Sequence, residues 1–241
     1  MSGPLAVPVT PPHRFYRRHG KRAFDLAVTL VSMIVALPVI GVLALVVLVT
    51  SGRPVLFLQE RVGQHGRIFR IWKFRSMVVG AHLHEHGYYL KDKDPRITWC
   101  GRWMRALSLD ELPQLFNVVK GDMSLVGPRP NLQFVVDQYR PLYESILSAR
   151  PGLTGYVAIR GRNRLRRSEM LEWDQKYVHE ISLGTDLKII VETVPSVLLR
   201  KGSTNDVSKE FLEDVERQGA PPEPSPPSAP STPARPPSDG E

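Results

Sequence analysis

The sequence contains a single cysteine, fewer acidic than basic residues, and no motif of the common nucleotide-binding folds. Cys100 alone excludes an internal disulfide and is typical of a reducing compartment, and nothing beside it indicates an activated thiol. Neither a P-loop nor a dinucleotide-binding fingerprint occurs. We recognise no secretory signal peptide, because the first apolar run starts late and no small-residue cleavage site follows it.

The charge balance is basic, with 32 Lys and Arg against 24 Asp and Glu and a formal net charge of +8 at pH 7. This excess indicates an anionic partner, either nucleic acid, anionic lipid or a phosphorylated substrate, and charge alone does not choose among them. A length of 241 residues with 42% hydrophobic residues allows one ordinary domain plus tails. Residues 219–241 are rich in Pro and Ser, carry few large apolar side chains, and are predicted to be disordered.

A long uncharged run occupies residues 26–50, and a helix of about 20 apolar residues is enough to cross a bilayer. Pro38 lies at its midpoint and favours a bend. Both flanks are basic, with Arg14, Arg17, Arg18, Lys21 and Arg22 before the run and Arg53, Arg61, Arg67, Arg70, Lys73 and Arg75 after it. Because the positive-inside tendency places both ends in the cytoplasm, a re-entrant helix hairpin bent at Pro38 is predicted. The alternative is a single spanning helix that tolerates its proline.

The remaining chain predicts an α+β fold that is mainly helical, with a small β element and interfacial amphipathic helices. Strands are expected at 55–60 and 68–74, and helices at 112–120, 131–149 (interrupted by Pro141), 168–182, 185–201 and 206–218. The stretch 76–98 is polar and expected to be irregular.

Two adjacent carboxylates, Asp110 and Glu111, precede Pro113, which is tolerated only in the first turn of a helix. We therefore expect a helix that starts between Ser108 and Asp110, with both carboxylates at its N-terminus. The simple interpretation is helix capping. The functional interpretation is an ionised nucleophile close to a phosphate.

A rigid basic segment follows, in which Arg129 stands between Pro128 and Pro130. Such a segment loses little entropy on binding, and the guanidinium fork suits a phosphate, although a surface turn explains the same pattern. Lys73 and Arg75 add positive charge to the same site in the functional interpretation, and form a solvated face in the simple one.

These motifs, taken together, resemble one known family. The stretches are KRAFDL from 21, FLQERVG from 57, KFRSM from 73, DPRIT from 94, GRWMRALSLDELPQLFNVVKGDMSLVGPRP from 101, RPGLTG from 150, GRN from 161 and DQKYVHEISLGTDLKII from 174. The chain resembles bacterial sugar transferases of the monotopic phosphoglycosyl transferase family, in its minimal catalytic form. The resemblance covers about three quarters of the chain.

The resemblance implies a monotopic enzyme on the cytoplasmic face of the bacterial inner membrane, held there by the re-entrant hairpin. Such enzymes transfer a phospho-sugar from a nucleotide diphosphosugar, usually a UDP-sugar, to polyprenol (undecaprenyl) phosphate, and release UMP. They need Mg²⁺ and start the membrane steps of exopolysaccharide or lipopolysaccharide assembly. The implied partners are the donor, the acceptor and membrane lipid, without nucleic acid, and a homodimer is admitted.

The resemblance also implies residue roles. It makes Asp110 the nucleophile, Asp110 and Glu111 the metal-binding catalytic pair, Arg129, Lys73, Arg75 and Asp186 the substrate- or phosphate-binding residues, and Pro38 the hairpin bend. The implied division is a tail (1–20), the hairpin (21–52), a cytosolic catalytic domain (53–203), a C-terminal helix (204–218) and the disordered tail (219–241). Two positions depart from the family pattern: Leu37 replaces a serine before the hairpin proline, and Ala158 replaces a glutamine.

Three alternatives remain open from the residues alone. The alternating histidines His82, His84 and His86 suggest a metal site or, more simply, a mobile polar loop. The arginine-rich stretch 160–167 favours a membrane-anchored basic binding module. A catalytically inactive scaffold is the third. The Asp110–Glu111 pair argues against both the binding module and the scaffold.

Overall fold

The computed structural model describes residues 15–81, 94–161 and 165–198. The predicted helix 206–218, the tail 219–241 and the histidines of 82–86 lie outside the described residues. The helices are α1 (Lys21–Ser51), α2 (Trp99–Ala106), α3 (Gln114–Lys120), α4 (Gln133–Gln138), α5 (Arg140–Ile146), α6 (Tyr156–Arg160), α7 (Arg167–His179) and α8 (Leu183–Leu198). The strands are β1 (Leu56–Val62), β2 (Ile68–Phe74), β3 (Ser124–Val126) and β4 (Gly152–Thr154). The described fold is therefore mainly helical with little sheet, as predicted.

The two sheets are both small. Strands β1 and β2 pair antiparallel across the turn at Gly63–Arg67, and β2 has the bounds that its alternating side chains predict. Strands β3 and β4 pair in parallel. The predicted helix 131–149 is divided at Tyr139 into α4 and α5, with Pro141 in the first turn of α5, where its missing N–H costs nothing.

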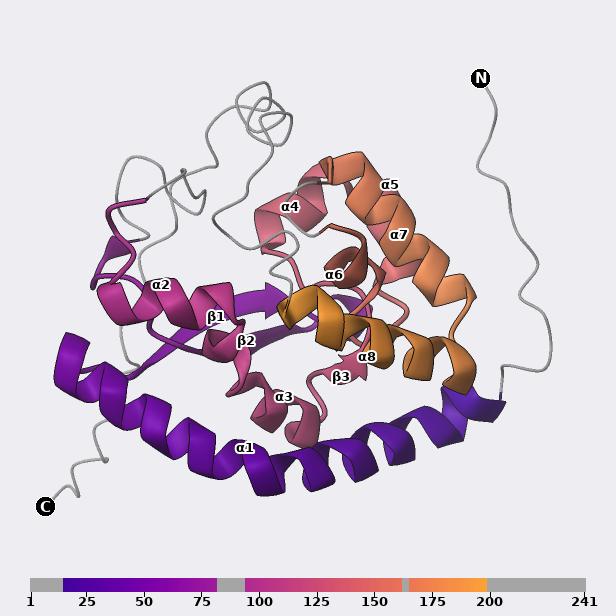
Figure 1. Ribbon diagram of the computed structural model, residues 1–241. Coiled ribbons are helices and arrows are strands. Elements are labelled where there is room, and N and C mark those ends of the chain that lie inside the picture. Colours follow the sequence, from indigo (N-terminus) through magenta and orange to yellow (C-terminus); the bar gives the residue numbers. More distant parts are fainter. Residues whose placement is uncertain (1–14, 82–93, 162–164, 199–241) are drawn as a thin grey trace, which may run out of the picture.

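Helix α1 continues without interruption through Pro38 and curves beneath the rest of the molecule (Figure 1). The re-entrant turn at this proline is therefore not confirmed. One face packs on the body and buries Lys21, Asp25, Thr29, Ala36, Leu43 and Val47, while apolar side chains such as Ile34 and Val49 are exposed on the other. With the turn before it, the helix is long and apolar enough to cross a membrane, by length and composition only.

Both ends of α1 are fixed to the same body. Near its start, Lys21 donates to Asp186 of α8 at 2.7 Å. At its end, the buried Arg75 donates to the backbone carbonyls of Ser51, Gly52 and Arg53. The last carbonyls of a helix have no intrahelical partner and carry partial negative charge, so a cation is well placed there. Arg75, predicted as a phosphate ligand, thus uses its guanidinium to hold the end of α1.

The main core fills the space between α1 and the helices above it. Val118 of α3, Val126 of β3, Tyr177 of α7 and Ile189 of α8 are fully buried in one cluster with Met123. In Figure 1, α3, β3 and α8 form the layer directly above α1, and α4, α5 and α7 lie above that layer. The strand β3 therefore lies in the core, and the loop that follows it starts from a rigid support.

Replacement of Arg75 tests its structural role. We expect Arg75→Met to lower the free energy of unfolding by about 2–4 kcal/mol, because several charge-assisted hydrogen bonds are lost at a buried position. In a thermal melt of the detergent-solubilised protein, the midpoint falls by roughly 5–10 °C. Arg70→Met on the preceding strand β2 is the control, since Arg70 is exposed and its pair with Glu60 is 3.6 Å long. Equal midpoints for the two variants would contradict the assignment.

Candidate active site

The acidic pair lies in a short 3-10 turn, Leu109–Glu111, between α2 and α3. The expected start of an α-helix at residues 108–110 is wrong, because α3 begins only after Pro113. Ser108 enters the turn in the left-handed conformation (φ 56°), and the N–H of Glu111 donates to its carbonyl at 3.2 Å. The turn holds Asp110 inward, where it is 6% exposed.

Lys73 of β2 reaches this turn and donates to Glu111 over 2.8 Å, in a pair that is about one fifth exposed on each side. The Asn117 side chain ties α3 to the same strand. Its amide donates to the carbonyl of Arg70 at 2.8 Å, and its oxygen accepts the N–H of Trp72 at 3.1 Å. These contacts fix the position of β2, and with it Lys73, relative to the acidic turn.

The electrostatics of Asp110 follow from burial among charges. Burial raises the pKa of Asp110, the neighbouring Glu111 raises it further, and the positive charges of Lys73 and Arg105 lower it. Burial likewise lowers the pKa of Lys73, which Glu111 and Asp110 raise, and which the charge of Arg129 lowers. The described site thus combines two carboxylates with several cations. Such an arrangement stabilises the charge that develops when a phosphoryl group is transferred.

Arg129 is held by a close crossing of two backbone segments. The N–H of Gly127 donates to the carbonyl of Thr154 at 2.9 Å, and the N–H of Gly152 donates to that of Pro128 at 2.8 Å. A Cβ atom on Gly127 or Gly152 would collide with the facing backbone, so the sequence needs glycine at both positions. The prediction of a rigid segment around Arg129 agrees with this packing.

Asp186 lies in a different buried cluster. It accepts from Lys21 and Tyr16 at 2.7 Å and from Tyr177 at 2.8 Å. The same Tyr177 hydroxyl lies 2.9 Å from the carbonyl oxygen of Val126 and shares its one proton between the two acceptors, which ties α8 and α1 to the strand before Arg129. Within the described ranges, no contact joins Asp186 to the acidic turn. Its predicted role in binding substrate stays a prediction, and its visible role is to hold the scaffold.

Three site residues were missed from the sequence. Arg105 and Arg61 act electrostatically on Asp110 and Lys73 respectively, and both stand in stretches that carry the family resemblance. Arginine is common on surfaces, so its type alone gave no signal. The third, Asp174, is almost fully buried in the middle of α7, where a carboxylate in a polar helix suggests solvent exposure.

The acidic pair suits Mg²⁺ by the chemistry of its donors. Carboxylate oxygens are hard ligands, and Mg²⁺ in phosphate chemistry uses one or two of them and completes its octahedron with water and phosphate oxygens. Within the described part of the chain, no group of three or more His, Cys, Asp or Glu gathers into a metal cage. Asp110 and Glu111 thus fit a metal that arrives with a phosphorylated substrate better than one held entirely by protein.

Comparison with known proteins gives a consistent family. A family model described as "Bacterial sugar transferase" matches residues 16–200. An undecaprenyl-phosphate galactose phosphotransferase from Salmonella typhimurium and a UDP-galactose-lipid carrier transferase from Erwinia amylovora are each 39% identical over 201 residues, which cover 77% of this chain and 42% of each relative. The exopolysaccharide production protein ExoY from Sinorhizobium fredii is 35% identical over 199 residues, which cover 76% of this chain and 88% of ExoY. This chain thus spans less than half of the two longer relatives and most of the shorter one.

Proposed function

The chain belongs to the bacterial sugar transferase family, and from that premise we propose that it transfers a phospho-sugar from a UDP-sugar to undecaprenyl phosphate, a polyprenol phosphate. The names of the relatives from Salmonella and Erwinia support this donor and acceptor. The observation that carries the proposal is the buried carboxyl of Asp110 beside Glu111, within electrostatic reach of Lys73 and Arg105. A carboxylate that only capped a helix would not need to be buried.

In the first step, a carboxylate oxygen of Asp110 attacks the β-phosphorus of the donor. A bond forms between that oxygen and phosphorus, the bond from phosphorus to the bridging oxygen breaks, and UMP leaves with the electron pair. A carboxylate whose pKa is raised is more nucleophilic once ionised, and the charges of Lys73 and Arg105 keep an ionised fraction available. The product on the enzyme is an acyl phosphate, in which the phosphosugar is bonded to the carboxylate of Asp110.

In the second step, a phosphate oxygen of the lipid acceptor attacks the same phosphorus. The bond between phosphorus and Asp110 breaks, the carboxylate is restored, and a polyprenol diphosphosugar is released. Phosphoryl transfer depends mainly on alignment and charge neutralisation. Lys73 and Arg129 supply positive charge on elements that are already rigid, so little reorganisation accompanies the reaction.

We propose that Asp110 and Glu111 hold Mg²⁺ together with the phosphates of the donor. When bound there, the metal would supply positive charge to the phosphates of the donor. The ion pair with Lys73 holds the carboxylate of Glu111 at the same site.

We also propose that α1 enters and leaves the membrane on the cytoplasmic side. Both of its ends contact the same body, and the segments on both sides of it are basic. Helix α8 adds an exposed apolar stripe made of Leu183, Leu187, Val191 and Val194. A polyprenol phosphate carries its reactive end at the headgroup level, so a site held against that surface meets it directly.

The first experiment measures UMP release from a panel of UDP-sugars by the full-length protein in nanodiscs with undecaprenyl phosphate and Mg²⁺. We expect Asp110→Asn to reduce the rate by at least about 10³-fold, because an amide cannot form the acyl phosphate. Asp137→Asn on α4 is the matched control, since that carboxylate is exposed, and it keeps the rate.

Substantial turnover by a folded Asp110→Asn variant would overturn the nucleophile assignment. Absence of UMP release by the wild-type protein across a broad donor panel would favour the scaffold or binding module instead.

The pH dependence gives an independent prediction. Asp110 must be ionised to attack, so the rate falls as the pH decreases through its raised pKa. Lys73→Met removes a charge that lowers this pKa, and we expect the acid limb of the rate to move to higher pH. Lys120→Met, which removes an exposed lysine of α3, is the control. A limb that stays in place or moves to lower pH in Lys73→Met would contradict the assigned charges.

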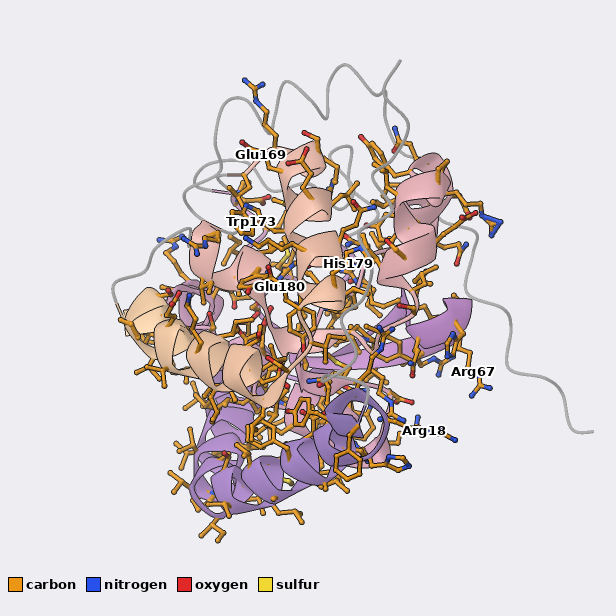
Figure 2. All side chains as sticks on the ribbon, turned by 90° about the vertical axis from the view of Figure 1, so that its right-hand side faces the viewer. Arg18, Arg67, Glu169, Trp173, His179 and Glu180 are labelled. Atoms are coloured by element: carbon orange, nitrogen blue, oxygen red, sulfur yellow. The ribbon has the colours of Figure 1, made fainter. Side chains whose placement is uncertain are left out.

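Membrane topology is tested with single cysteines at two exposed positions, Arg18 and Arg67, which Figure 2 shows at the same side of the molecule. In a Cys100→Ser background, Arg18→Cys and Arg67→Cys are treated separately with a membrane-impermeant thiol reagent. We expect neither to react in intact cells and both to react after permeabilisation. Labelling of only one of them in intact cells would show that α1 spans the membrane.

A further inference from the structure

An open pocket lies beside Arg129, at the glycine crossing. It encloses about 370 Å³ when the open solvent at its mouth is included. It is lined by Gly127, Arg129, Gly152, Leu153, Thr154, Gly155, Val157, Ala158, Met170 and Asp174. Only Arg129, Thr154 and Asp174 bring polar side chains, and the hydroxyl of Thr154 is already bonded to Thr193 at 2.7 Å. The pocket thus has largely apolar and backbone walls.

Asp174 is the unusual group in this lining. It is 2% exposed, and one of its carboxyl oxygens, Oδ1, has no hydrogen-bond partner among the described residues. The backbone N–H of Arg129 donates to the carboxyl. Because a buried oxygen without a partner is costly, its partner is expected to come from outside the chain. Asp174 lines the pocket, so a molecule bound there lies beside this carboxyl.

Arg129 connects this pocket with the acidic turn. Its charge acts on Asp174 on one side and on Lys73 on the other, and Lys73 bonds Glu111. A molecule whose diphosphate lies among these cations therefore has one end in line with the pocket. The donor has two ends, a sugar and a nucleoside.

We propose that the pocket holds the uracil ring of the donor, with Asp174 hydrogen-bonded to its imide edge. This inference rests on the proposed function. A nucleobase has two flat apolar faces and one polar edge, which match apolar walls with a single available polar group. A sugar carries several hydroxyls around its ring, and these need more polar side chains than Asp174 and Arg129 provide.

The protonation of Asp174 agrees with this pairing. Burial raises the pKa of Asp174 to about 8, against the opposing backbone N–H of Arg129 and the charges of Arg129 and Arg167. Tyr143 of α5 is the next titratable group, since Asp174 and Arg167 both act on its hydroxyl. A neutral carboxyl donates through its O–H and accepts through its C=O, which complements the O4 and N3–H of uracil. Above the raised pKa the O–H is lost, so uridine nucleotides bind more weakly.

The test measures the Kd of UDP and of UMP by calorimetry with the full-length protein in nanodiscs. At pH 7, we expect Asp174→Asn to bind within about threefold of wild type, because an amide also donates and accepts on one edge. Asp174→Leu weakens binding by about tenfold or more. Tyr143→Phe is the matched control, since it removes a neighbouring buried and unbonded hydroxyl that does not line this pocket, and it binds as wild type does.

Two further arms identify what the pocket holds. From pH 7 to pH 9, the wild-type affinity for UMP falls more than that of Asp174→Asn, which shares every other titration, including that of uracil. Ala158→Leu, which fills the pocket from α6, weakens UMP binding and leaves binding of galactose 1-phosphate unchanged. Thermal melts confirm that each variant is folded.

The inference is overturned if folded Asp174→Leu and Ala158→Leu bind UMP as wild type does, since Asp174 then holds only water. It is also overturned if these variants lose galactose 1-phosphate and keep UMP, because the pocket then holds the sugar. In both cases UMP release that depends on Asp110 leaves the proposed function standing. A wild-type protein that neither binds UDP nor releases UMP contradicts both.

Discussion

The ion pair between Lys73 and Glu111 is the contact on which the site depends, because it joins the two parts of the molecule that build it. Lys73 comes from the antiparallel β1–β2 pair, and Glu111 comes from the turn between α2 and α3. Neither part can move without separating charges in a partly buried environment, which is costly. Asn117 duplicates the connection with two hydrogen bonds to the backbone of β2. Asp110 is thereby held beside cations that oppose the effect of its own burial.

Arg129 depends on a second constraint, the close approach of two backbone segments at Gly127 and Gly152. The strand before it is held through Tyr177 to Asp186, and Asp186 in turn pairs with Lys21 of α1. The same chain of contacts that fixes α1 therefore also supports Arg129. In the proposed function, this coupling ties the reacting groups to the helix that meets the membrane surface, where a lipid-linked phosphate would lie.

The sequence was informative where side-chain type and spacing decide the structure. Alternating residues predicted the bounds of β2. The charges of Asp110, Glu111 and Arg129 all act on Lys73, while the roles of these residues in catalysis stay predictions. It was less informative where tertiary contacts decide. A basic side chain that binds phosphate and one that caps a helix, as Arg75 does, look the same in a sequence. Likewise, a carboxylate in α7 gives no sign that the fold buries Asp174 beside the backbone of Arg129. Pro38 favours a bend locally, yet packing along one face of α1 keeps the helix continuous.

The central claim is that Asp110 carries the phospho-sugar, and mass spectrometry of the protein tests it most directly. The protein is exposed briefly to Mg²⁺ and to a UDP-sugar that it accepts as a substrate, without the lipid acceptor. The account predicts a mass increase equal to one sugar phosphate, located on the peptide that contains Asp110, and its disappearance when undecaprenyl phosphate is added. An unmodified Asp110 peptide throughout, in protein that releases UMP once the acceptor is present, would contradict it.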